Sequence, residues 1–256
     1  MSLTRLALRI AASAPQVEDY QRYLFVGPHP DDIEVGAGAT AAKLAAAGKQ
    51  VCFLICTDGR FGLEHAPKGT TPEALAELRQ AEERASARAL GVEDVRFLSF
   101  CDGGFYDFEA LVQAMAQIVG EIQPECILAP DPDVSSECHV DHKNAGEAAK
   151  RLAFFAPYPE IMAKYGAAAA PVKALALYMT AKPNRFVGTR GRLNRQLSSI
   201  LCHGTQFPSD SEAFKSLSLY LKLRSLDFGL RSLKGRAEGF CVLGQTHMHC
   251  LPEAGR

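Results

Sequence analysis

Tyr23-Leu24-Phe25-Val26-Gly27-Pro28-His29-Pro30-Asp31-Asp32-Ile33-Glu34 is the stretch of this 256-residue sequence that decides its fold. Its four leading apolar residues predict a buried strand. The two prolines that follow predict a rigid turn, which presents one imidazole and two adjacent carboxylates. At the carboxyl end of a parallel strand, such a turn lies in the crevice where open α/β sheets bind their ligands.

A second polar cluster, His139-Val140-Asp141-His142, lies about a hundred residues later. The two clusters supply enough His and Asp side chains for a three-ligand metal site, with groups left over for acid–base chemistry. Asp32, His29 and one histidine of the second cluster would leave an open position, which is typical of catalytic rather than structural zinc. The other imidazole, held by Asp141, would be a positioned acid or an oxyanion donor. The pattern predicts a metal-dependent hydrolase.

Strand and helix patterns alternate along most of the chain. Gly48 and Gly91 stand where helix C-caps belong. This alternation predicts an α/β fold with a Rossmann-like, mostly parallel sheet and helices on both of its faces. Strand-like runs lie at 23–27, 51–57, 94–100, 125–129 and 174–179, and helix-like runs at 37–47, 71–90, 108–122 and 142–155.

The last part of the sequence departs from this alternation. It contains a basic stretch at 182–195, which we interpret mainly as a solvated face, and helical patterns near 190–203 and 210–234. An apolar run at 240–243 follows. Because there is no low-complexity linker or internal repeat, we expect a single domain over 1–256, with a core at about 22–206 and a C-terminal elaboration at about 207–256.

Composition excludes several classes of protein. A hydrophobic content of 47%, a charged content of 22% and a formal net charge of −1 argue against nucleic acid as the main partner. The eight cysteines are scattered without a CxxC pair, which favours reduced thiols. Residues 3–14 lack a convincing signal-peptide core, and no run approaches the ~20 apolar residues of a membrane helix. We therefore expect a cytoplasmic protein with no membrane partner.

The two clusters resemble the signature motifs of the PIG-L/LmbE-like N-acetylglucosaminyl de-N-acetylase family. The resemblance covers most of residues 22–206 and includes Glu34 just after the first motif. It implies that the chain uses a divalent metal, commonly zinc, on a Rossmann-like fold to hydrolyse the acetamide of an N-acetylated sugar conjugate and release acetate. Other shared features, in order, are Thr57-Asp58-Gly59, Arg79-x-x-Glu82, Leu90-Gly91 and His203-x-x-Gln206.

The resemblance also implies which residues bind the metal and which acts as the base. His29, Asp32 and His142 would be the metal ligands. Asp31 would be the general base acting on the attacking water. Relatives are often homo-oligomers, so the resemblance implies a homo-oligomer here as well.

Three further residues receive roles in the same way. His139, paired with Asp141, would stabilise the tetrahedral intermediate or protonate the leaving amine. Arg79 resembles the family arginine that lies near the substrate or product carboxylate. Some members place a tyrosine two residues before the first histidine of the second motif, whereas this chain has Glu137. That position is left without an assigned role.

Several alternatives remain open. The same site would also suit another amide substrate or a group transfer, and a sugar-binding protein without catalysis is a rival outside the enzyme class. The Gly36–Ala41 run fits a dinucleotide fingerprint, but the segment between it and the strand favours packing of small residues instead. The tail cluster of His247, His249 and Cys250 could form a second metal site, and its role is not predicted.

Overall fold

The computed structural model, which describes residues 11–249 and 251, contains a seven-stranded sheet. Its strands are β1 (Arg22–Gly27), β2 (Gln50–Thr57), β3 (Asp94–Phe100), β4 (Cys126–Pro130), β5 (Ala174–Tyr178), β6 (Arg185–Gly188) and β7 (Ala237–Gly244). They lie in the order β3-β2-β1-β4-β5-β7-β6. The strands from β3 to β5 are parallel, whereas β7 runs antiparallel to both β5 and β6. The predicted mostly parallel sheet is confirmed.

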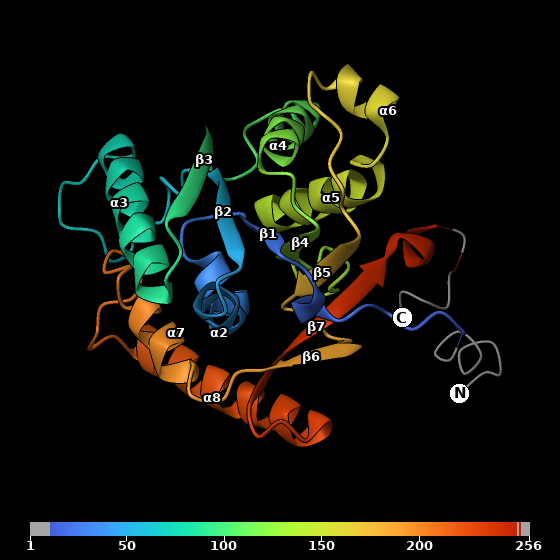
Figure 1. The fold of residues 1–256 in the computed structure, drawn as a ribbon. Coiled ribbons are helices and arrows are strands. Elements are labelled where there is room, and N and C mark those ends of the chain that lie inside the picture. The colour runs from blue at the N-terminus through green and yellow to red at the C-terminus, as the bar shows by residue number, and fades with distance from the viewer. Residues whose placement is uncertain (1–10, 250, 252–256) are drawn as a thin grey trace.

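Helices cover both faces of this sheet (Figure 1). They include α2 (Asp32–Ala46) and α3 (Pro72–Leu90) on one face, and α4 (Phe108–Ile122) and α5 (Val140–Phe155) on the other. Side chains alternate along β1 with the two-residue period of a strand. Tyr23 and Phe25 pack toward α2 and α3, and Leu24 and Val26 pack toward α4 and α5. Because both faces are buried, the strand is apolar throughout, as parallel strands usually are.

The turn after β1 is shorter than the sequence indicates. The prediction placed the first helix at 37–47, but α2 begins at Asp32. Pro30 restrains only its own φ and the residue before it, so the chain is free to turn into a helix two residues later. The helix is kinked at Ala37, whose φ of −149° is not helical. Asp32 therefore lies in a helical turn and Asp31 lies at its N-cap.

Glycines serve the packing of α2 and the end of α3. A Cβ added to Gly36 would lie 2.2 Å from a ring carbon of Tyr178, so this glycine lets the helix approach the sheet closely. The expectation that the Gly36–Ala41 run serves packing is confirmed. Gly91 ends α3 with a φ of 89°, a left-handed conformation that disfavours other residues.

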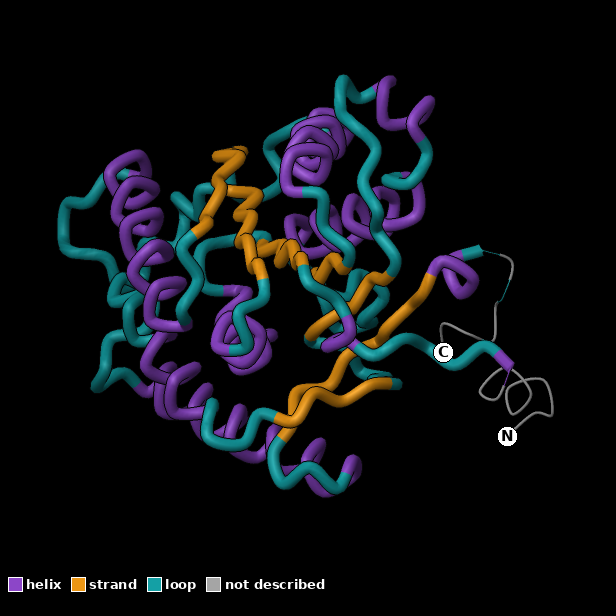
Figure 2. The backbone as a smooth tube through the Cα atoms, viewed as in Figure 1, coloured by secondary structure: helices purple, strands orange, loops and turns teal. Residues whose placement is uncertain are grey.

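The C-terminal part of the chain adds α7 (Leu193–Ile200) and α8 (Glu212–Ser232), and a short α6 (Pro159–Lys164) precedes it. The two helices predicted near 190–203 and 210–234 are confirmed, and each is shorter than the predicted range. The basic stretch at 182–195 is not a uniformly solvated face, because it contains β6, which pairs with β7 (Figure 2). Arg195 within it also donates to the carbonyl oxygen of Ala89 at 2.6 Å.

Among residues 11–249 and 251, no helix is both long enough and apolar enough to cross a membrane.

Candidate active site

The two polar clusters meet at the carboxyl ends of β1 and β4, where the parallel topology places them. His29 follows β1, and His142 lies in the first turn of α5 after β4. Their ring centroids are 5.3 Å apart. Beside them lies a cavity of about 380 Å³, whose lining includes His29, Asp31 and His139. This volume suits a small organic ligand.

Asp32 lies between two imidazoles. Its Oδ2 atom is 3.1 Å from Nδ1 of His29 and 3.3 Å from Nε2 of His142. One donor atom from each of the three residues lies within 4.8 Å of the other two. Two imidazoles and one carboxylate form a common ligand set for catalytic zinc and similar ions. The structure therefore brings the predicted ligands together in an arrangement that could hold a metal ion.

The second ring nitrogen of His142 supports this arrangement. Its Nδ1 atom lies 3.1 Å from Oε2 of Glu137. In the neutral form of His142, a proton on Nδ1 would face Glu137 and leave the lone pair of Nε2, on the side of Asp32, available to an ion. Ligating histidines usually donate their other N–H to a carboxylate in this way. Glu137, which the sequence left without a role, is the residue that orients His142.

His29 is oriented in the same manner by two other carboxylates. Its Nε2 atom lies 3.1 Å from Asp102 and 3.1 Å from Asp141. This leaves Nδ1 to face Asp32. Both histidines thus direct one nitrogen at a shared point and anchor the other on a carboxylate, which is the fit expected of a metal site.

A second group of possible ligands overlaps the first, since it combines His29 with Asp102, His139 and Asp141. Its two carboxylates are already used as acceptors. Asp102 accepts the N–H of Phe61 at 3.2 Å, and Asp141 accepts the N–H of Gly103 at 2.7 Å. His29, Asp32 and His142 therefore remain the predicted metal ligands, and Asp102 and Asp141 support His29.

Asp31 adjoins the ligands and lines the cavity. Its carboxylate accepts from Nη2 of Arg79 at 2.9 Å, and its backbone N–H donates to Glu83 at 3.1 Å. Its φ of 122° is rare for a residue with a side chain. Burial raises the pKa of Asp31 to about 6, against the opposing effect of Arg79. A carboxyl group with this pKa can exchange a proton near neutral pH.

Arg79 binds the protein backbone and also lines the cavity. It is 4% exposed, and it donates to the carbonyl oxygens of Gly59 at 2.9 Å and Pro30 at 2.6 Å. The guanidinium also lines the cavity. The carboxylate that it contacts in this structure is that of Asp31, at 2.9 Å, so the predicted contact with a carboxylate of the substrate or product remains a prediction.

His139 lies at the mouth of the site with 46% of its side chain exposed. Its Nδ1 atom is 3.7 Å from Oδ2 of Asp141, too far for a hydrogen bond, and it accepts the backbone N–H of Asp141 at 3.3 Å. Burial, followed by the charges of His29 and His142, lowers the pKa of His139. The structure thus places His139 beside the ligands, while the carboxylate of Asp141 is closer to His29.

Asp102 is the residue that the sequence analysis missed. It follows the carboxyl end of β3, as His29 follows β1, so the rule that located the first cluster could have found it. A lone Asp between Cys101 and Gly103 gave no motif to draw attention to it.

The tail histidines lie outside the site. His247 uses Nδ1 to accept the N–H of Gly244 at 3.1 Å, and its Nε2 lies 2.8 Å from the carbonyl oxygen of Ala12. His249 stacks on Phe154, with ring centroids 5.6 Å apart. Within the described residues, neither belongs to a group that could hold a metal. Cys250 lies outside the described residues.

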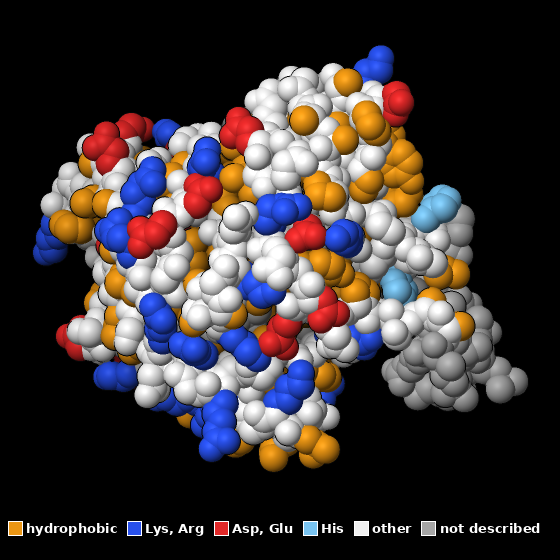
Figure 3. Space-filling view, viewed as in Figure 1, with side chains coloured by type: hydrophobic (Ala, Val, Ile, Leu, Met, Phe, Trp, Pro, Cys, Tyr) orange, Lys and Arg blue, Asp and Glu red, His pale blue; other side chains and the backbone are white. Residues whose placement is uncertain are grey.

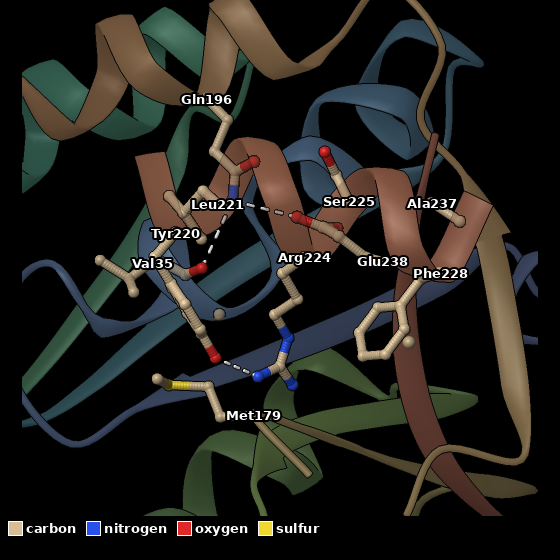
Figure 4. Close-up of a pocket in the computed structure, with 12 residues that line it drawn as sticks. Val35, Met179, Gln196, Tyr220, Leu221, Arg224, Ser225, Phe228, Ala237 and Glu238 are labelled. Carbon is tan, nitrogen blue, oxygen red and sulfur yellow. Dashed lines mark hydrogen bonds between the residues drawn. The ribbon is translucent and has the colours of Figure 1, made fainter. Parts of the chain in front are cut away.

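A second cavity lies under α8, lined by residues that include Val35, Gln196, Tyr220 and Glu238 (Figure 4). Its interior of about 20 Å³ has room for roughly one water. Gln196 donates to Glu238 across it at 3.0 Å. It is too small for a sugar. Two cavities of about 480 and 460 Å³ lie elsewhere on the molecule, but the cavity beside His29 is lined by residues of both motifs, which makes it the candidate substrate site.

Known proteins resemble this chain over most of its length. The diacetylchitobiose deacetylase of Thermococcus kodakarensis is 30% identical over 92% of this chain and 88% of its own length. A 1D-myo-inositol 2-acetamido-2-deoxy-alpha-D-glucopyranoside deacetylase of Thermomonospora curvata is 32% identical over 74% of this chain and 72% of its own. The crystal structure of N,N'-diacetylchitobiose deacetylase from Pyrococcus horikoshii superposes with a TM-score of 0.85 and 28% identity, covering 96% of this chain and 93% of that one.

The family comparison covers the segment that carries both motifs. Residues 24–153 match the family described as PIG-L, GlcNAc-PI de-N-acetylase. The resemblance inferred from the sequence is confirmed, and with it the expectation of a de-N-acetylase. The chain belongs to the PIG-L family of GlcNAc-type de-N-acetylases.

Proposed function

We propose that this protein hydrolyses the acetamide of an N-acetylglucosamine-type sugar conjugate and releases acetate. The observation that carries the proposal is the convergence of His29, Asp32 and His142 beside Asp31, which is not part of that ligand set, at a cavity of about 380 Å³. A metal clip without catalysis would not need a base of raised pKa next to its ligands. The names of the relatives support the same reaction.

His29, Asp32 and His142 would hold one divalent ion, for which we propose zinc because the donor set is two imidazoles and one carboxylate. When bound, the ion supplies a Lewis acid that polarises the acetyl carbonyl and makes the attacking water more acidic. Glu137 keeps His142, and Asp102 and Asp141 keep His29, in the tautomer that can bind the ion.

The remaining groups move protons and stabilise charge. Asp31 takes the proton of the water as it adds to the acetyl carbon. His139 donates to the developing oxyanion or to the amine nitrogen as the C–N bond breaks, so that an amine and acetate are the products. Arg79 holds Asp31 in place, and we propose that it also contacts the carboxylate of the product, since it lines the same cavity.

The proposed organisation of the whole chain follows from the sheet. We propose a single domain, because β7 of the C-terminal segment lies between β5 and β6. We also propose a cytoplasmic location. The seven cysteines within the described part of the chain are unpaired, which suits a reducing compartment.

We propose that the protein is a homo-oligomer. Five leucines at spacings of four and three residues form one stripe on α8 and at its C-cap: Leu219, Leu223, Leu226, Leu230 and Leu233. They are 40% to 95% exposed. Lys and Arg side chains surround this part of the surface, toward the lower edge of the molecule (Figure 3). A leucine stripe of this period is typical of a helix that packs against another helix.

Acetate release tests the proposed reaction. Zinc-loaded protein is incubated with N-acetylglucosamine, N,N'-diacetylchitobiose and an N-acetylglucosaminyl inositol, and acetate and free amine are measured separately. We expect both products in equal amounts from at least one compound. Amine without acetate would indicate a different reaction, and neither product from any compound, with saturable sugar binding retained, would favour the binding protein.

A further inference from the structure

A second cluster of metal-ligand side chains lies behind the active site, away from the cavity. It consists of Glu34 from α2, Glu83 from α3 and His203 from the turn after α7. Each of the three is 0% exposed. One donor atom from each residue lies within 4.8 Å of the others. None of the three belongs to the ligand set or the acid–base groups of the proposed reaction.

Each carboxylate of this cluster has one oxygen with a hydrogen-bond partner and one without: Oε1 of Glu34 accepts from Ser86 at 2.7 Å, and Oε2 of Glu83 accepts from the backbone N–H of Asp31 at 3.1 Å. Oε2 of Glu34, Oε1 of Glu83 and both ring nitrogens of His203 are buried without a hydrogen bond. Leaving a buried polar atom unpaired is costly, and the cost is largest for charged groups. Four such atoms on three side chains, with one donor atom of each residue within 4.8 Å of the others, indicate that a binding partner belongs there.

The distances within the cluster suit ligands of a common ion better than hydrogen-bonded neighbours. Nε2 of His203 is 3.7 Å from Oε1 of Glu34 and 3.8 Å from Oε2 of Glu83. Both exceed the ~3.2 Å limit of a normal hydrogen bond. Two atoms bound ~2.0–2.2 Å from one ion at tetrahedral angles lie roughly 3.3–3.6 Å apart. Small movements would bring all three side chains onto one ion.

Charge also favours a divalent cation. Glu34 and Glu83 are both ionisable and fully buried, so two negative charges would face each other away from water. A divalent cation bound to both carboxylates and to a neutral His203 gives a neutral cluster. Two carboxylate oxygens and one imidazole nitrogen are donors that zinc, manganese and iron(II) accept.

We propose that Glu34, Glu83 and His203 bind a second divalent cation of the zinc, manganese and iron(II) class. It is a structural ion that ties α2, α3 and the turn after α7 together. Through Glu83, which accepts the backbone N–H of Asp31 at 3.1 Å, it also supports the unusual backbone of that residue. The ion never touches the substrate, because its ligands do not line the cavity.

Metal content of the intact protein tests the inference without disturbing the cluster. Protein purified from zinc-supplemented medium is dialysed and analysed by inductively coupled plasma mass spectrometry. We expect two equivalents in the wild type and one in His142→Ala, which loses the active-site ion only. One equivalent in the wild type and none in His142→Ala would overturn the second site, whatever the acetate assay shows.

Two variants on α3 test whether the ion that remains in His142→Ala is bound by Glu83. Glu83→Gln should lower the content from two equivalents to one, whereas Glu77→Gln, an exposed residue of the same helix, should keep both. Where Glu83→Gln fails to fold, anomalous diffraction at the zinc edge from wild-type crystals decides. A peak between Glu34, Glu83 and His203 supports the site, and a single peak at His29, Asp32 and His142 refutes it.

Discussion

Nη2 of Arg79 lies 2.9 Å from Oδ2 of Asp31 and 2.6 Å from the carbonyl oxygen of Pro30, so one guanidinium holds both the side chain and the backbone beside the candidate base. The backbone that it holds has a φ of 122°. Such a conformation costs on the order of 1–3 kcal/mol and persists only where surrounding contacts enforce it. Because Asp31 must face the cavity while Asp32 faces the imidazoles, the strain follows from placing two adjacent carboxylates in different directions.

Replacement of Asp31 by Asn should abolish turnover without releasing the metal. The amide has nearly the same size and still accepts from Arg79, but it cannot take a proton. A positioned base typically contributes roughly 10²–10⁴-fold, so we expect a loss of that order in kcat. The comparison is made at full metal loading, with Asp133→Asn, on an exposed loop, as the control. Equal kcat in wild type and Asp31→Asn would remove Asp31 as the base.

Replacement of Glu137 by Gln should weaken the metal site while leaving its ligands in place. Oε2 of Glu137 lies 3.1 Å from Nδ1 of His142, and loss of a carboxylate beside a ligating histidine typically costs 10–100-fold in metal affinity. Zinc affinity is measured by competition with a chromophoric chelator. Glu147→Gln, an exposed change on α5, the helix that contains His142, serves as the control. An unchanged affinity for Glu137→Gln would show that this carboxylate does not orient the ligand.

Glu238 should make stability depend on pH. Burial raises the pKa of this carboxyl group from 4.5 to about 7, against opposing hydrogen bonds from Thr40, Ala39 and Gln196. Between these two values the folded protein holds a proton that the unfolded chain has released. The free energy of unfolding therefore falls as the pH rises from about 4.5 to about 7.

The Glu238→Gln variant separates this residue from the other titrating groups. The variant cannot titrate at this position, so the decline of its free energy of unfolding over the same pH range should be shallower. Urea titrations at intervals of pH give both curves. Parallel curves for the two proteins would contradict the raised pKa, even if the variant is less stable at every pH because an acceptor is lost.

Charge placed on the leucine stripe of α8 should separate the proposed oligomer. Leu223 and Leu230 are 59% and 67% exposed, so Leu223→Glu with Leu230→Glu should leave the monomer folded. Light scattering after size-exclusion chromatography is expected to give the 27.7 kDa monomer. Leu78→Glu on α3, where the leucine is 42% exposed, controls for an added charge. An unchanged oligomer would place the interface elsewhere.

Much of the fold was predictable from local pattern. The apolar run before Gly27 and the alternation of periods predicted the parallel strands and their helices. The predicted ends of helices and strands were less accurate where the local sequence preference did not decide the structure. Pro30 indicated an irregular turn, yet α2 begins at Asp32, because a proline restrains only itself and the residue before it. The antiparallel pairing of β6 with β7 depends on partners about 50 residues apart, which no local window reports.

The sequence by itself determined where the candidate catalytic and metal-binding side chains lie, because two dense motifs follow two strands and contain His29, Asp31, Asp32, His139 and His142. The tertiary structure decided how these groups are oriented. It placed Asp102 on His29, Glu137 on His142 and Arg79 on Asp31, and it buried Glu34, Glu83 and His203 together. The physical reason is that hydrogen-bond partners and burial depend on which strand ends and helices become neighbours, and that is set by the packing of the whole sheet.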